Sequence, residues 1–246
     1  MRRLTVLLLA LAACQAEPTE VGVAQADVTV VPRSPALAGP VAGAKERVAS
    51  FVSWASRSAP SDVPEIRRQR ATVRDDAAAV AALADHAFDA VDHSHALVAL
   101  SLLGEMRSPH AEPHLLRVVS MPLPPSQEGE HDPRADVEML QAKAVDGLAY
   151  LHTASADAQV LRIAGSHESR AVRAEAIDAY LFNHGDSEDA RKSLAKAIAP
   201  ADRIFLDRPR FMPGESAAEF DAKLAAFLAK HPEVQAPAPT HREVVR

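Results

Sequence analysis

The sequence has a single cysteine, no excess of positive charge and no long hydrophobic run. One Cys in 246 residues excludes a disulfide framework and any zinc or iron–sulfur site with several Cys ligands. A net charge of −6 argues against a general nucleic-acid-binding protein, which would be basic. The longest apolar run, residues 4–13, would rise about 15 Å as a helix, half of a hydrocarbon core of roughly 30 Å.

Signatures of catalysis and of cofactor binding are also missing. The chain contains no GxSxG, GxGxxG, P-loop or HExxH sequence and no CxxCH haem-attachment sequence. We therefore expect a protein that is not an enzyme and carries no cofactor or metal.

The composition that is present is that of a folded protein. Hydrophobic residues make up 48% of the chain and charged residues 24%, so wholesale disorder is not expected. The length suits one domain, or two small ones, with a sizeable core.

The N-terminus has the pattern of a secretory signal, with Arg2 and Arg3 before the apolar run. That run ends in Leu11, Ala12 and Ala13, followed directly by Cys14. This end resembles the lipobox of bacterial lipoproteins. The resemblance implies cleavage after Ala13, a lipid on Cys14 and a signal peptide at residues 1–13. The alternative is an ordinary signal peptide with a coincidental Cys.

The lipoprotein resemblance also implies a location. Lipid chains on Cys14 would anchor the chain to a membrane of the bacterial cell envelope. Gln15 follows the Cys, where Asp is the inner-membrane retention signal of enteric bacteria. We therefore expect the periplasmic side of the outer membrane rather than the inner membrane.

Proline placement divides the rest of the chain. Residues 14–41 are rich in Pro and Gly and are predicted to be the lipidated N-terminus and a flexible linker. Residues 42–234 are predicted to form a helical domain, because they contain long Pro-free stretches rich in Ala, Leu, Glu and Arg. Residues 235–246 are predicted to be a disordered tail.

A helical pattern repeats within residues 92–198. One apolar face with the spacing i, i+1, i+4, i+7 recurs three times, and a second helix is predicted after each copy. The face consists of Ala96, Leu97, Leu100 and Leu103 in the first copy, Ala144, Val145, Leu148 and Leu151 in the second, and Ala176, Ile177 and Tyr180 in the third. A helix pair cannot bury such a face alone, so the copies are expected to stack.

The third copy resembles a HEAT repeat. Its Val172 and Arg173, with Ala176 and Ile177 after them, match the family's Val-Arg-x-x-Ala-aliphatic opening. The second copy has Leu140-Gln141 in place of Val-Arg, and the first has Asp92-His93. The resemblance implies an all-α fold, a short α-solenoid of HEAT-like helical hairpins. An irregular helical bundle is the alternative.

Two segments lie outside the repeats. An insert, residues 120–137, separates the first copy from the second, and its Glu128, Glu130, His131 and Asp132 mark an interaction loop, unless it is only a floppy excursion. Residues 200–231 are predicted to cap the stack, with arginines of the segment paired to Asp202 and Asp207. Its last helix is predicted to begin with a Ser216–Glu219 capping box.

Histidines and arginines offer weaker candidates. His110 and His114 are spaced to share a helix face, but a metal site needs three or four converging ligands. The arginines of residues 67–74 precede Asp75 and Asp76, which favours a solvated charged turn over a contact with anionic lipid headgroups.

Three functions follow from these patterns. The leading hypothesis is a membrane-anchored lipoprotein that acts as a non-catalytic protein-interaction scaffold or assembly factor, with an envelope protein as partner and no nucleic acid. The second is an enzyme on a HEAT-like scaffold, of the lyase or hydrolase type. The third is a periplasmic metal-binding protein, suggested by the 11 His.

Overall fold

The computed structural model describes residues 34–90, 92–127, 132–211 and 214–232. Within these ranges all regular structure is helical and no strand occurs, which confirms the predicted all-α fold. The signal peptide, the lipobox with Cys14, most of the linker and the tail lie outside the described residues. The rest belongs to one compact unit, 34–246.

The helices begin and end close to the boundaries that the Pro-free stretches predict. In chain order they are α1 (Ala44–Ala55), η1 (Pro60–Asp62), α2 (Val63–Val73), α3 (Ala77–Asp89), α4 (His93–Met106), η2 (Pro109–Ala111), α5 (Glu112–Val119), α6 (Pro133–Tyr150), α7 (Ala154–Ser166), α8 (Arg170–Asn183), α9 (Glu188–Ala197), η3 (Pro200–Asp207) and α10 (Ala217–Lys230). The three copies of the repeat are the pairs α4–α5, α6–α7 and α8–α9.

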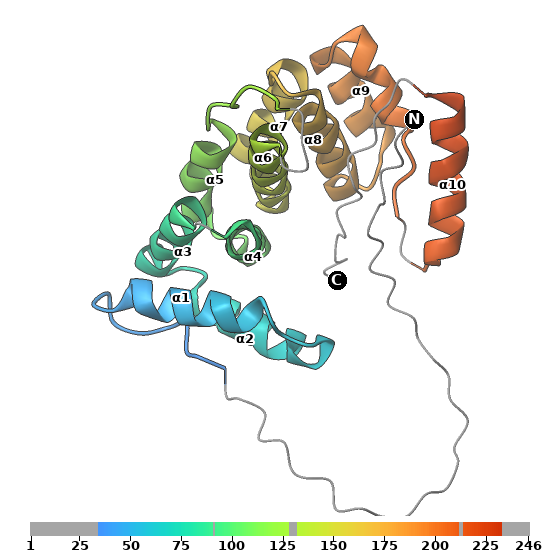
Figure 1. The fold of residues 1–246 in the computed structure, drawn as a ribbon. Coiled ribbons are helices and arrows are strands. Elements are labelled where there is room, and N and C mark those ends of the chain that lie inside the picture. The colour runs from blue at the N-terminus through green and yellow to red at the C-terminus, as the bar shows by residue number, and fades with distance from the viewer. Residues whose placement is uncertain (1–33, 91, 128–131, 212–213, 233–246) are drawn as a thin grey trace, which may run out of the picture. The chain divides into compact units, whose positions relative to one another are not determined.

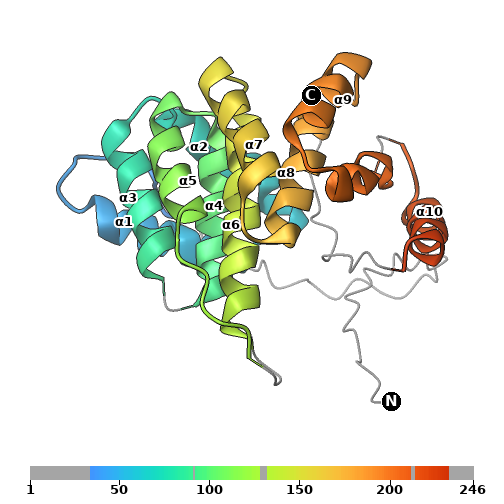
Figure 2. The ribbon, with the colours of Figure 1, turned by 90° about the horizontal axis from the view of Figure 1, so that it is seen from above.

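The helices pack in two rows (Figure 1). In one row α4 packs against α6, and α6 against α8. In the other row are α3, α5, α7 and α9, and α3, α5 and α7 each pack against the first-row helix that follows in the chain. Figure 2 shows the same order from α3 to α9. Packing that recurs with every helix pair is the arrangement expected of a solenoid, because each pair buries its apolar face on its neighbours.

The turn inside each helix pair has the same construction. Arg107, His152 and Asp186 all adopt the left-handed conformation, each with a φ of 52°. The next residue is a Ser or Thr in every case, and its side chain accepts a hydrogen bond from a backbone N–H at the start of the following helix. The three turns are therefore structurally equivalent, although only the third has a glycine, Gly185, next to its left-handed residue.

Two glycines let neighbouring helices of the first row approach closely. A Cβ atom at Gly104 of α4 would lie 2.5 Å from Cα of Gly147 in α6. At Gly147 a Cβ would lie 3.2 Å from Cα of Gly104 and 3.0 Å from the side chain of Leu115. The crossing of α4 and α6 therefore depends on the absence of side chains at these two positions.

The predicted linker is too long at its C-terminal end. Leu37 is only 1% exposed, and its backbone N–H donates to Oε1 of Gln69 in α2 at 3.0 Å. Ser34 donates its hydroxyl to Glu65 of the same helix at 2.5 Å. Residues 34–41 are therefore part of the folded domain, because an apolar side chain in this Pro-rich segment is buried against α2.

The C-terminal cap is held by charges buried against α8. Asp178 of α8 pairs with Arg208 at 3.0 Å and with Arg210 at 3.1 Å, and these three residues have side chains 8%, 5% and 6% exposed. Asp202 of η3 pairs instead with Arg173 of α8 at 2.7 Å. The expectation that arginines of this segment pair with Asp202 is therefore wrong, since that carboxylate is used by α8.

Candidate functional site

An ordered segment without regular structure follows α5. We call residues 121–127 the strap. It is fixed at its start by Gln141, a fully buried residue of α6, whose side-chain amide donates to the carbonyls of Val119 at 3.1 Å and Met121 at 2.7 Å. Holding an irregular segment in place costs conformational entropy, and here one buried polar side chain offsets part of that cost.

Asp132 fixes the other end of the insert. Its carboxylate accepts hydrogen bonds from the Ser126 hydroxyl at 2.8 Å, from the Gln127 N–H at 3.2 Å and from the Arg134 N–H at 3.0 Å. The Ser126 hydrogen bond is the largest cause that lowers the pKa of Asp132 below its ordinary value. Asp132 is thus the N-cap of α6, and the insert ends there and not at residue 137, because α6 already begins at Pro133.

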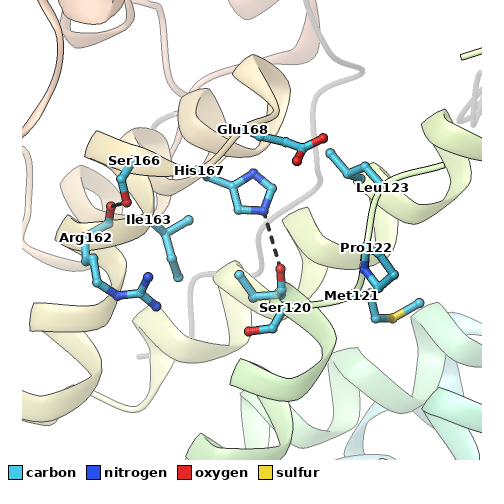
Figure 3. Close-up of a pocket in the computed structure, with 10 residues that line it drawn as sticks. Ser120, Met121, Pro122, Leu123, Arg162, Ile163, Ser166, His167 and Glu168 are labelled. Carbon is cyan, nitrogen blue, oxygen red and sulfur yellow. Dashed lines mark hydrogen bonds between the residues drawn. The ribbon is translucent and has the colours of Figure 1, made fainter. Parts of the chain in front are cut away.

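The strap borders a groove with the end of α7 and the turn that leads to α8 (Figure 3). We call it the strap groove; its volume is about 380 Å³. Its walls combine apolar side chains with two serines and three residues that can carry charge. They are Val119, Ser120, Met121, Pro122, Leu123, Arg162, Ile163, Ser166, His167 and Glu168.

His167 bridges the two sides of the strap groove. Its Nδ1 accepts the N–H of Ser169 at 3.1 Å, so the ring proton of the neutral imidazole lies on Nε2. Nε2 faces the carbonyl of Val119 at 3.4 Å, drawn as the dashed line from His167 in Figure 3. The ring therefore ties the α7–α8 turn to the end of α5, and both of its nitrogens have partners in this tautomer.

The polar groups at the mouth of the strap groove include charges of both signs. Arg162 is exposed and donates through Nε to Gln159 at 3.0 Å. Glu168, in the turn between α7 and α8, accepts a weak hydrogen bond from Arg134 at 3.4 Å. The exposed lining of the groove is more polar than apolar, so hydrogen bonds and charge would carry much of the recognition of a ligand there.

The way the strap is held recurs in the next repeat. Arg173 of α8 occupies the position that Gln141 occupies in α6, and its Nη1 donates to the carbonyls of His167 at 2.7 Å and Glu168 at 3.2 Å. In both repeats a buried or half-buried side chain in the first helix reaches back to the loop that precedes it. The strap and the α7–α8 turn, the two edges of the groove, are therefore positioned by equivalent residues.

A second, smaller cavity lies between α1, α2 and α4. Its volume is about 200 Å³, and its apolar lining includes Ile66 and Leu102. Arg70 of α2 reaches it with a side chain 7% exposed and pairs with Glu105 of α4. This ion pair ties the first helices to the repeat stack and leaves little polar surface in the cavity free for a ligand.

In the described part of the chain, several histidine rings lie near another histidine or a carboxylate. No group of three or more His, Cys, Asp or Glu side chains that could hold a metal ion occurs there. His93 faces Asp136 at 3.7 Å and His184 faces Asp157 at 3.3 Å, as separate pairs. None of the described helices is long and apolar enough to cross a membrane.

The predicted site residues are only partly placed. Leu11, Ala12, Ala13 and Cys14 lie outside the described residues, and so do Glu128, Glu130 and His131. Asp132 is described, as the helix cap. Sequence reasoning missed Gln141, Arg162 and His167. The available signal for Gln141 was its position as a polar residue on the apolar face of α6. No sequence pattern marks Arg162 or His167, because these residues meet the strap only in the folded chain.

No family model, no curated protein and no solved structure matches this chain.

Proposed function

We propose that this chain is a lipid-anchored, non-catalytic binding protein of the bacterial cell envelope, and that the strap groove is where it binds a protein partner. The observation that carries the binding role is the ordered strap. Long irregular segments that are held in place are commonly functional, since their order has to be maintained against entropy. The lipobox resemblance at Leu11, Ala12, Ala13 and Cys14 carries the anchoring.

The composition of the strap groove favours an extended polypeptide as ligand. Three of the seven strap residues are prolines, Pro122, Pro124 and Pro125, so the strap is a preformed extended edge that loses little entropy on binding. Leu123 and Met121 supply apolar contacts, while Arg162 and Glu168 at the rim can select among partners by charge.

Site-specific photocrosslinking in intact cells tests the binding role. A photoreactive amino acid at Leu123 is expected to capture one discrete protein, and the same amino acid at Lys196, exposed on α9, is the matched control. Adding Arg162→Glu should weaken capture at position 123. Identical products from positions 123 and 196 would contradict the proposal.

The anchor is tested separately. Mass spectrometry of the purified mature chain should find a diacylglycerol thioether on Cys14, and Cys14→Ser should release the protein from the membrane fraction. An unmodified Cys14 in membrane-extracted protein would refute the anchor and leave the groove experiment unaffected.

A further inference from the structure

The strap has an outer edge in addition to the side that borders the strap groove. Its sequence includes Pro122-Leu123-Pro124-Pro125. Pro122 and Pro125 are exposed, whereas Leu123 and Pro124 are half-buried. Figures 1 and 2 show the strap at the border of the helix stack, with no described helix outside it. We call Pro122 and Pro125 the outer edge; of the two, only Pro122 also borders the strap groove.

Proline constrains the backbone of this segment. Its ring holds φ at roughly −65°, and a residue that precedes a proline is driven toward polyproline II or extended dihedral angles. Met121, Leu123 and Pro124 each precede a proline, so the whole segment is constrained in one of these ways. A polyproline II helix has about three residues per turn, which puts Pro122 and Pro125 on one face. Their exposure, with two half-buried residues between them, agrees with that geometry.

The outer edge has hydrogen-bond acceptors and almost no donors. Proline lacks a backbone N–H, so Leu123 supplies the single N–H of residues 122–125. In the part of the chain that the structure describes, the backbone carbonyls of these residues accept no hydrogen bond. A β-strand partner would need alternating donors and acceptors, which this segment does not offer. A partner must therefore bring its own donors to the carbonyls.

The strap is held in place at both ends, so the outer edge is already ordered. Gln141 donates to the carbonyl of Met121 at 2.7 Å, and Asp132 accepts the hydroxyl of Ser126 at 2.8 Å. A free proline-rich peptide fixes part of its conformation only when it binds, and it loses entropy in doing so. In the strap that entropy is lost during folding, which leaves the outer edge ready for binding.

We infer that the outer edge is a ligand for a partner protein with a groove lined by aromatic side chains. Grooves of that kind bind segments with two prolines three positions apart, as Pro122 and Pro125 are. Trp and Tyr suit the role, because their flat rings pack on proline while their N–H or O–H groups donate to carbonyls. The inference goes beyond the proposed function, since the partner reads the strap from outside and needs no ligand in the strap groove.

An array of purified SH3 and WW domains, two classes that bind proline-rich segments, provides the probes. The full-length protein in detergent is expected to bind at least one of them. Pro122→Ala with Pro125→Ala should weaken that binding several-fold or more. Pro109→Ala with Pro113→Ala removes two exposed prolines at the start of η2 and α5 and is the matched control, with no change expected.

The array also defines the results that contradict the inference. Circular dichroism first checks that both double variants are as helical as the parent. No binding to any domain, equal losses in the two variants, or binding that survives the loss of Pro122 and Pro125 would overturn the role of the outer edge.

A synthetic peptide with the sequence of residues 118–127 tests the contribution of the fold. It should bind the same domain several-fold more weakly than the protein, because it has to be ordered on binding. Gln141→Met, which leaves both prolines of the outer edge in place, should also weaken binding by the protein. A peptide that binds as tightly as the protein would show that the fold does not present this edge, and would reject the inference.

Failure of the outer edge is distinguishable from failure of the strap groove. Photocrosslinking from Leu123 reports on the groove, whereas the array reports on Pro122 and Pro125. A discrete crosslinked protein together with no bound SH3 or WW domain would reject the outer edge as a ligand and leave the proposed role of the groove standing.

Discussion

At the scale of single residues, small and polar side chains determine how closely these helices approach and where loops are held. Gly104 and Gly147 allow α4 and α6 to cross nearly in backbone contact. Gly165 does the same for α7, since a Cβ there would lie 2.3 Å from the carbonyl oxygen of Ala197. Close-packed interiors adjust little to added volume, so these positions should be sensitive to one methyl group.

We predict that Gly104→Ala lowers the free energy of unfolding by about 1–3 kcal/mol, despite the better helix propensity of Ala, because its methyl group meets backbone that cannot move aside. Gly147→Ala should cost less, since the nearest contact of its Cβ is the movable side chain of Leu115. Urea unfolding followed by circular dichroism measures both. A Gly104→Ala variant as stable as the parent would show that the helices can separate at no cost.

At the scale of helices and loops, the second and third repeats each position their preceding loop through one side chain. Gln141 in α6 and Arg173 in α8 hold the strap and the α7–α8 turn by donating to their carbonyls. A buried carbonyl that loses its donor keeps the desolvation cost without the hydrogen bond. The two edges of the strap groove should therefore loosen independently when these residues are changed.

Gln141→Met, which keeps the side-chain length, should destabilise the protein by about 1–3 kcal/mol. Hydrogen exchange followed by mass spectrometry should become faster in residues 121–127. Arg173→Met is the comparison, with faster exchange expected near residues 167–169 and, because Arg173 also pairs with Asp202, in η3. Faster exchange throughout the chain in either variant would mean that the side chain supports the whole stack and not its own loop.

The C-terminal cap depends on a buried charge. Asp178→Ala leaves Arg208 and Arg210 buried without that carboxylate, and we expect a loss of about 3–5 kcal/mol. Trypsin should then cleave more readily after Arg210, whereas the bond after Arg208 precedes Pro209 and resists trypsin. Asp189→Ala, an exposed change in the same repeat, should alter stability by no more than about 0.5 kcal/mol. Similar losses from the two variants would remove the assigned role of Asp178.

At the scale of the whole molecule, the two ends of the stack are closed in different ways. At the N-terminal end, Ser34 and Leu37 are hydrogen-bonded to α2, and Arg70 of α2 pairs with Glu105. At the C-terminal end, η3 and residues 208–210 cover α8 with ion pairs. A stacked-repeat protein needs such ends because the terminal pairs would otherwise expose their apolar faces.

Stability should fall as the pH drops below about 6.5. Burial, with the nearby charge of His95, lowers the pKa of His86, and burial, with Arg107, lowers the pKa of His152. In both cases the unfolded chain takes up protons at a higher pH than the folded chain. Above the unfolded pKa these two histidines therefore cost no stability. Stability is lost as the pH falls from that value through their lower pKa in the folded state.

Urea unfolding at pH 7.5 and at pH 5.5 compares the parent with His86→Gln. The variant should lose less stability between the two conditions, because its unfolded state no longer gains that proton. A loss as large as the parent's would assign the pH dependence to other groups.

The amino-acid sequence by itself determined the helical class, the three helix pairs and the helix starts. These depend on proline positions, apolar spacing and N-capping residues, all of which act within a few residues of the chain. The Ser216–Glu219 capping box is confirmed for the same reason. Only the tertiary structure decided that Leu37 joins the core, that Asp178 is the partner of Arg208 and Arg210, and that Gln141 and His167 both contact the carbonyl of Val119. Such contacts join residues far apart in sequence, and their pairing depends on how the helices pack.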